Sequence, residues 1–71
     1  MAYNAQELTE FYKAVRAYGL ASPQQREGQV LFNVLCALRP DLAEQIRATN
    51  LDPFYDDTRM PDTFTWIVQN W

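Results

Sequence analysis

Apolar residues recur along the chain at the three- and four-residue spacing that lines one face of an α-helix. The first such stripe contains Leu8, Phe11, Val15 and Tyr18. It predicts a helix over residues 5–18 whose stripe belongs to the core, with Tyr12 off its centre as a flank contact or on an exposed surface. Asn4 and Glu7 are spaced as a capping box at the start of this helix, and Gly19 is placed to end it.

The next segment is apolar on more than one face, which is typical of a central helix that the others pack against. Ser22 is a favoured N-cap, Pro23 suits the first helical position, and Gln25 is placed to complete a second capping box. These residues predict a helix over residues 23–38. Asn33 interrupts the apolar run, either as a buried amide with a backbone partner or, as we favour, on the narrow side that faces water.

Two shorter helices follow. Pro40 ends the second helix and fits the first turn of a third, predicted over residues 40–48, because the residue before a proline avoids helical geometry. The last helix is predicted over residues 62–70, and its apolar face consists of Phe64, Ile67, Val68 and Trp71. Between them, residues 51–61 form an acidic and aromatic loop with a proline near each end.

No alternating strand pattern or hairpin dipeptide interrupts this order of elements. The sequence therefore predicts an all-α fold, a compact bundle of four helices with a short third helix, in one helical domain over residues 1–71. A domain of this size buries only about 60–65% of the surface of its unfolded chain, so its margin of stability is small.

Composition narrows the classes of function without changing the fold. The 48% of hydrophobic and 21% of charged residues are ordinary for a folded, soluble chain. The longest apolar run, residues 34–38, is far shorter than the roughly 20 residues of a membrane span, and no basic segment followed by an apolar one begins the chain. The single cysteine, Cys36, lies in that run and has no partner for an internal disulfide. We therefore expect a cytoplasmic, intracellular protein that does not engage a membrane.

Charge is distributed unevenly. Residues 1–39 carry four basic and three acidic side chains, whereas residues 40–71 carry two and six, for a net charge of −3. This balance disfavours a nucleic-acid partner, because phosphate binding needs clustered Lys and Arg. A recognition helix built from the third helix would offer Arg47 to the bases but would bring Asp41 and Glu44 to the phosphates.

The residues needed for most catalytic chemistry are missing from the sequence. The chain has no histidine, so the usual nucleophile–base pairs and transition-metal sites cannot be assembled from it. Asp52, Asp56 and Asp57 cluster in a domain too small to enclose a substrate pocket. Their order lacks the alternating oxygen ligands, central glycine and closing glutamate of an EF-hand loop. We therefore expect no enzymatic activity, no cofactor and no metal.

Phe54 and Tyr55 are the sharpest candidates for function, because two adjacent large aromatic side chains in a loop cannot easily point the same way. We expect one ring to anchor the loop in the core. The other, Tyr55 with its polar tip, would lie exposed beside Asp56 and Asp57 as an aromatic anchor with an acidic rim, and Arg59 follows in the same loop. The alternative is that both rings lie under the last helix and the aspartates only cap turns.

Trp66 raises the same question on the last helix. Helical geometry places it about 100° from Ile67 and roughly 160° from Phe64, so we expect it to be at least partly exposed. Three things would then cover it: a target protein, a second copy of the chain, or the 52–61 loop of its own chain.

Four segments between about residues 28 and 71 carry a resemblance to known proteins: Phe32-Asn33-Val34-Leu35, Leu38-Arg39-Pro40-Asp41-Leu42-Ala43, Ile46-Arg47-Ala48-Thr49 and Leu51-Asp52-Pro53-Phe54-Tyr55-Asp56-Asp57. Together they resemble small accessory proteins of bacteriophage and mobile-element genomes. The resemblance includes no motif of assigned chemistry, and it implies an accessory protein that modifies a host or phage machine by binding it. In size, charge sign and an aromatic pair near the third helix, the chain is also similar to the acidic four-helix immunity proteins of bacteriocins.

These features predict a small, non-enzymatic protein-interaction module that binds a host or phage protein through the 52–59 loop and the last helix. One alternative is a homo-oligomeric structural or accessory protein that buries its aromatic side chains between copies. A second alternative is a helix-turn-helix-like DNA binder. The residues expected to form the protein-binding site are Phe54, Tyr55, Asp56, Asp57, Arg59 and Trp66.

Overall fold

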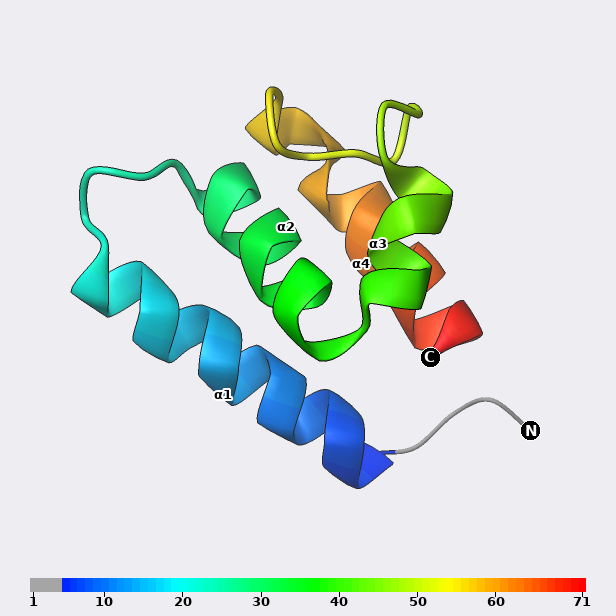
Figure 1. Ribbon diagram of the computed structural model, residues 1–71, viewed down its shortest axis with the longest axis horizontal. Helices are drawn as coiled ribbons and strands as arrows, with labels where there is room; N and C mark the ends of the chain where they lie inside the picture. Colours follow the sequence, from blue (N-terminus) through cyan, green and yellow to red (C-terminus); the bar gives the residue numbers. More distant parts are fainter. Residues whose placement is uncertain (1–4) are drawn as a thin grey trace.

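The computed structural model describes residues 5–71. It contains α1 (Ala5–Ala21), α2 (Glu27–Leu38), α3 (Pro40–Ile46), the 3₁₀ turn η1 (Asp57–Arg59) and α4 (Met60–Asn70) (Figure 1). Within this part of the chain there is no strand, which confirms the predicted all-α fold of four helices with a short third helix. None of the helices in residues 5–71 combines the length and the hydropathy that a membrane crossing requires.

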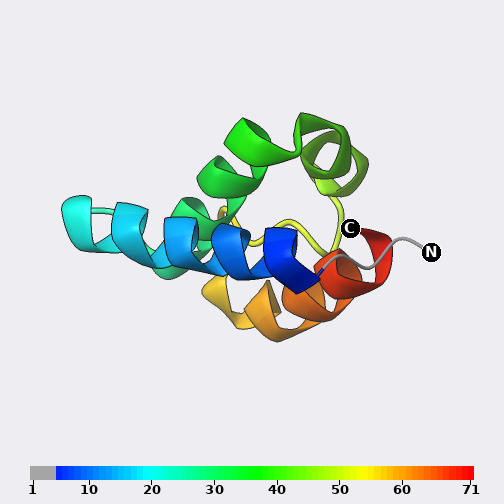
Figure 2. The same cartoon turned by 90° about the horizontal axis from the view of Figure 1, so that it is seen from below.

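The central helix is α2, which packs against α1 on one side and α3 on the other (Figure 1). Seen from below, α1 runs across the front, with α2 and α3 on one side of it and α4 on the other (Figure 2). All four helices contribute to one core, whose buried apolar residues are Leu8, Phe11, Val30, Leu31, Phe32, Val34, Leu35, Leu42, Ala43, Ile46, Ile67 and Trp71. In Figure 1 the segment between α3 and η1 lies on the side of the molecule opposite α1.

Helix α1 is longer than predicted and contributes less to the core. It continues through Gly19 to Ala21, so the prediction that Gly19 ends it is wrong. Leu8 and Phe11 are buried as expected, but Tyr18 is 36% exposed and does not belong to the core. The last turns of α1 project beyond the body of the bundle (Figure 2), so they are covered only in part. The predicted cap at Asn4 lies outside the described residues.

Helix α2 begins at Glu27 rather than at Pro23. Ser22 and Pro23 instead start a tight turn, closed by a hydrogen bond of 3.0 Å from the Gln25 N–H to the Ser22 carbonyl. Serine and proline are favoured at the first two positions of such a turn as well as at a helix start, so the same residues satisfy both patterns. Gln29 accepts from the Arg26 N–H at the true start of the helix.

Asn33 matches neither of the two environments predicted for it. Its side chain is half-buried on α2, and its amide donates to the Gln25 side chain at 3.2 Å. The partner is thus a side chain in the turn that precedes the helix, and not a backbone group. Asn33 helps to hold that turn against α2.

The ends of α3 and α4 also differ from the predicted bounds. Helix α3 stops at Ile46, two residues early, because Ala48 adopts the left-handed conformation with φ of 62°. Helix α4 starts at Met60 rather than at Asp62, with Pro61 in its first turn. The 3₁₀ turn η1 leads directly into α4, and the Asp56 side chain caps η1 by accepting from the Thr58 N–H. The capping group therefore lies before the region in which the sequence placed the helix start.

Candidate functional site

A buried carboxylate organises the loop that connects α3 to η1. Asp52 is 6% exposed, and its two oxygens accept from the Ala48 N–H at 2.7 Å and the Phe54 N–H at 2.9 Å. Hydrogen bonds from a charged acceptor are among the stronger ones in proteins. Asp52 therefore fixes the backbone on both sides of Pro53 and is not available to a ligand.

The loop is tied to α4 by two further side chains. The Arg59 guanidinium donates to the Thr49 carbonyl at 3.0 Å. The Thr63 hydroxyl, fully buried at the start of α4, donates to the Leu51 carbonyl at 2.6 Å. Both contacts hold the first part of the loop, one from the end of η1 and one from the first turns of α4.

The other side of the loop is seated on the first turn of α2. Asp57 accepts from the Gly28 N–H at 3.0 Å, as a carboxylate does at a helix N-terminus. The Arg26 side chain donates to the Phe54 carbonyl at 2.6 Å and lies 3.8 Å from the Asp57 carboxylate. A Cβ atom at Gly28 would lie 2.1 Å from the Pro53 carbonyl oxygen, so only glycine permits this approach of backbone to backbone.

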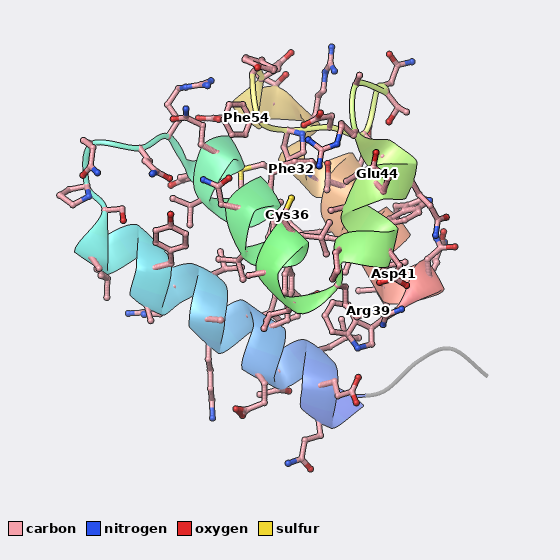
Figure 3. The ribbon with its side chains drawn as sticks, in the orientation of Figure 1. Phe32, Cys36, Arg39, Asp41, Glu44 and Phe54 are labelled. Carbon is pink, nitrogen blue, oxygen red and sulfur yellow. The ribbon has the colours of Figure 1, made fainter. Side chains whose placement is uncertain are left out.

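The two adjacent aromatic rings point in different directions, as predicted. Phe54 is half-buried, and its ring meets the edge of Phe32 on α2 with 6.1 Å between ring centroids (Figure 3). Tyr55 packs against Phe54 at 4.8 Å but remains 82% exposed. Phe54 is therefore the anchor of the loop, and Tyr55 is the ring that it presents.

Beside Tyr55 lies an open hollow of about 390 Å³, lined by Phe32, Asn33, Cys36, Arg47, Ala48, Asp52, Phe54 and Tyr55. The Arg47 guanidinium covers the Phe32 ring at 5.3 Å and pairs with Glu44 at 3.2 Å. Phe32 and Cys36 lie on α2 (Figure 3), and Arg47 and Ala48 directly follow α3, so the hollow lies between α2, the end of α3 and the loop. We call the residues that line it the Tyr55 surface.

The acidic rim predicted around Tyr55 is neutralised by neighbouring groups. Asp56 accepts from the Thr58 hydroxyl at 2.5 Å and lies 3.6 Å from Arg59. Asp57 is held by Gly28 and Arg26, as described above. The contacts of the two aspartates match the alternative prediction, in which they only cap turns. Tyr55 itself is exposed.

The hydrogen bonds to Asp56 have a consequence for pH dependence. Those from the Thr58 hydroxyl and N–H, followed by attraction to Arg59, hold the pKa of the Asp56 carboxyl below its ordinary value of about 3.9. A carboxyl with a lowered folded-state pKa stabilises the fold above its unfolded pKa and loses that effect as pH falls through the folded value. We expect the unfolding free energy to fall less steeply below about pH 4 in Asp56→Asn than in the wild type, measured by urea denaturation.

The Thr58 amide reports on the same group directly. Its proton chemical shift should titrate with a midpoint below that of a free aspartate, and Asp56→Asn should abolish this titration. A midpoint at or above the ordinary aspartate value would contradict the hydrogen-bonded geometry of η1.

Five of the six residues predicted to form the site are connected by contacts in and around the loop. Phe54, Tyr55, Asp56, Asp57 and Arg59 belong to one network around the loop, as described above. Trp66 is half-buried on α4 and packs against the core cluster. Within residues 5–71, no group of three or more carboxylate or cysteine side chains gathers in a way that would hold a metal ion.

Sequence reasoning missed the α2 side of the site, which consists of Arg26, Gly28 and Phe32, and also Arg47 after α3. Gly28 is the one signal that was available, since a glycine inside a helix often marks a close approach of another backbone. Comparisons with models of protein families, with curated proteins and with solved structures found no match. The geometry of the site is therefore the basis for the function proposed below.

Proposed function

We propose that this chain is a small, non-enzymatic protein-interaction module, an accessory protein that binds a partner protein through the 52–59 loop, with its Tyr55 surface, and the neighbouring face of α4. The observation that carries the proposal is the 82% exposure of the Tyr55 ring on a loop whose backbone is held by hydrogen bonds. Binding would occlude or recruit the partner. No catalytic step is part of this function.

The fixed backbone matters because association is weakened by the entropy of ordering loops and side chains. Asp52, Arg26 and Arg59 hold the loop through hydrogen bonds to its backbone, and Phe54 supports the Tyr55 ring from below. A tyrosine has few rotatable bonds and offers both an apolar face and a hydroxyl group. Such a preorganised ring beside a hollow is typical of the residues that dominate protein interfaces.

The other two readings of the sequence draw less support from the site. For a DNA-binding helix, α3 has only seven residues, and Arg47 already pairs with Glu44 and covers Phe32. For a homo-oligomer built on the Tyr55 surface, Arg47 would approach its own symmetry mate wherever the two-fold axis passes through the hollow. A concentration-dependent solution mass that disappears in Tyr55→Ala would favour the homo-oligomer.

The test uses Tyr55→Ala with Tyr18→Ala as its matched control, since both remove an exposed tyrosine. We expect the unfolding free energy of both variants to lie within about 0.5 kcal/mol of the wild-type value, because neither ring belongs to the core. Tyr55→Ala should weaken partner binding by at least about 2 kcal/mol, or roughly 30-fold, whereas Tyr18→Ala should not.

The partner is identified by placing a photo-crosslinking phenylalanine derivative at position 55 and, as a control, at position 18, in lysate of the cells that naturally produce the chain. The proposal requires a protein that crosslinks from position 55, that the wild-type chain displaces, and that Tyr55→Ala fails to displace. A crosslink that Tyr55→Ala displaces as well as the wild type does would refute it.

A further inference from the structure

A second surface lies between α1 and α4, away from the Tyr55 surface. It consists of two hollows of about 370 Å³ and 470 Å³ that share Val15 and Arg16 as lining residues. We call this surface the α1–α4 groove. Most of its lining comes from α1, between Thr9 and Leu20, and α4 contributes Met60 and Phe64. The first hollow is completed by Pro23 and Gln25 in the turn and by Glu27 and Val30 on α2. In Figure 2 the last turns of α1 extend beyond α4.

The floor of the groove is apolar. Val15, Met60 and Phe64 are only half-buried in the chain by itself, and Tyr12 lies against Phe64 with 5.6 Å between ring centroids. At the projecting end of α1, Leu20 is 75% exposed. Water therefore contacts apolar side chains of both α1 and α4 along the groove, which is the kind of surface that a partner covers.

The wall formed by α1 is basic. Four arginines elsewhere in the described chain each have a carboxylate within 3.8 Å, in the pairs Arg26–Asp57, Arg39–Asp41, Arg47–Glu44 and Arg59–Asp56. Arg16, which both hollows share, has no acidic partner among residues 5–71. Lys13 lies 3.9 Å from Glu10 in a largely exposed pair, which contributes little. One carboxylate, Glu27 on α2, lines the first hollow opposite this wall.

We propose that the α1–α4 groove binds an amphipathic helix of a partner protein, with acidic residues flanking the apolar face of that helix. The groove follows α1 from Thr9 to Leu20, a length of about 16 Å at 1.5 Å per residue, which equals about three helical turns. A docked helix places apolar side chains at positions i, i+4 and i+7 over this length. Its carboxylates meet Arg16 and Lys13 on the α1 wall.

Charge excludes the other obvious occupants. A second copy docked on the groove by two-fold symmetry would bring Arg16 close to Arg16 of that copy, because Arg16 lies at the middle of the surface. Nucleic acid needs more cations than Arg16 and Lys13 supply. The acidic helix is the occupant whose charge complements this wall.

The probe is a displayed library of 14-residue peptides on a helix-favouring scaffold. Positions 4, 8 and 11 are random, and so are the two positions that flank each of them. Selection uses the full wild-type chain as bait. We expect enriched peptides to carry Leu, Phe or Met at the three spaced positions and Glu or Asp beside them. Binding of an enriched peptide should weaken about ten-fold or more in Arg16→Glu, because an attraction becomes a repulsion.

The controls separate this groove from the Tyr55 surface. Arg16→Glu places an acid three residues after Lys13 on an exposed helix face, so we expect it to fold like the wild type by circular dichroism. The Tyr55→Ala variant should bind the selected peptide as tightly as the wild type does. Adding the peptide should change the amide chemical shifts of Val15, Arg16 and Gly19.

Each remaining outcome overturns the inference. Enrichment of basic or unpatterned peptides, the absence of any enriched peptide, or equal binding to Arg16→Glu would show that an acidic helix is not the occupant. A concentration-dependent solution mass with shifts confined to the groove would show that a second copy covers it. Loss of peptide binding in Tyr55→Ala would place the site on the other surface. The other results do not bear on the Tyr55 proposal.

Discussion

Gly28→Ala is expected to destabilise the fold by about 2–3 kcal/mol, although the same replacement in an ordinary helix is stabilising. A Cβ atom there would lie 2.1 Å from the Pro53 carbonyl oxygen and 2.6 Å from the Asp57 carboxylate. The first of these neighbours is backbone fixed by Asp52, so it has no cheap way to move. Relieving the clash would lift the loop from α2 and weaken the hydrogen bond from the Gly28 N–H to Asp57.

Gly19→Ala is the matched control, because Gly19 is also a helical glycine. Its added Cβ atom would meet Val30 at 3.7 Å, an ordinary contact, and α1 continues past this position. We expect this variant to be more stable than the wild type by about 0.5–1 kcal/mol, since alanine loses less backbone entropy on folding. Urea denaturation followed by circular dichroism measures both changes.

The opposite signs of the two glycine substitutions are the decisive result. If Gly28→Ala proves neutral or stabilising, Pro53 does not lie against the first turn of α2. The loop then does not support Tyr55 in the way described above. A loss in Gly28→Ala together with unchanged binding by Tyr55 would contradict the role of the seated loop in presenting the ring.

The periodicity of apolar residues predicted the helices well, because a repeat of three and four residues depends on helix geometry alone. Phe11, Leu35 and Ile67 are fully buried, and each comes from a segment that the pattern assigned to the core. Tyr18 matched the same pattern and is exposed. The pattern gives the face of a helix that is apolar, but it does not give the length of neighbouring helix that is present to cover that face.

Helix ends were predicted less well, since caps and turns use the same residue types. Ser22 and Pro23 suit both a helix start and a tight turn, and the turn is what lets α2 fold back on α1. Gly19 is compatible with a helix end but does not require one. Ala48, which ends α3 with φ of 62°, carries no such signal, because left-handed alanine is rare.

The site was predicted in part. That Phe54 anchors the loop while Tyr55 is exposed follows from local geometry, because neighbouring rings in a turn diverge. The partners of Asp57 do not follow from it, since Gly28 and Arg26 lie about thirty residues away in the sequence. Asp57 is held by long-range contacts of this kind, whereas Asp56 caps η1 through local hydrogen bonds.

Trp71→Ala is expected to cost about 3–5 kcal/mol, which is the range for removing a large buried aromatic side chain. Trp71 is 8% exposed, and its ring packs on Phe11 with 5.2 Å between centroids. The Arg39 guanidinium lies 5.0 Å from the ring centroid and donates to the main-chain oxygen of Trp71 at 2.6 Å. The indole N–H donates to Glu7 on α1 at 2.9 Å. This one residue therefore joins α1, α2 and α4.

The expected loss is comparable to the whole stability of a 71-residue domain, about 4–10 kcal/mol, so Trp71→Ala should be largely unfolded at 37 °C by circular dichroism. Trp71→Phe keeps the packing on Phe11 but removes the hydrogen bond to Glu7, and we expect it to fold with a loss of about 1–2 kcal/mol. Trp66→Ala serves as the comparison, because Trp66 is only half-buried and should cost less. If Trp71→Ala melts like the wild type while Trp66→Ala does not, Trp71 is frayed in solution and Trp66 closes the core in its place.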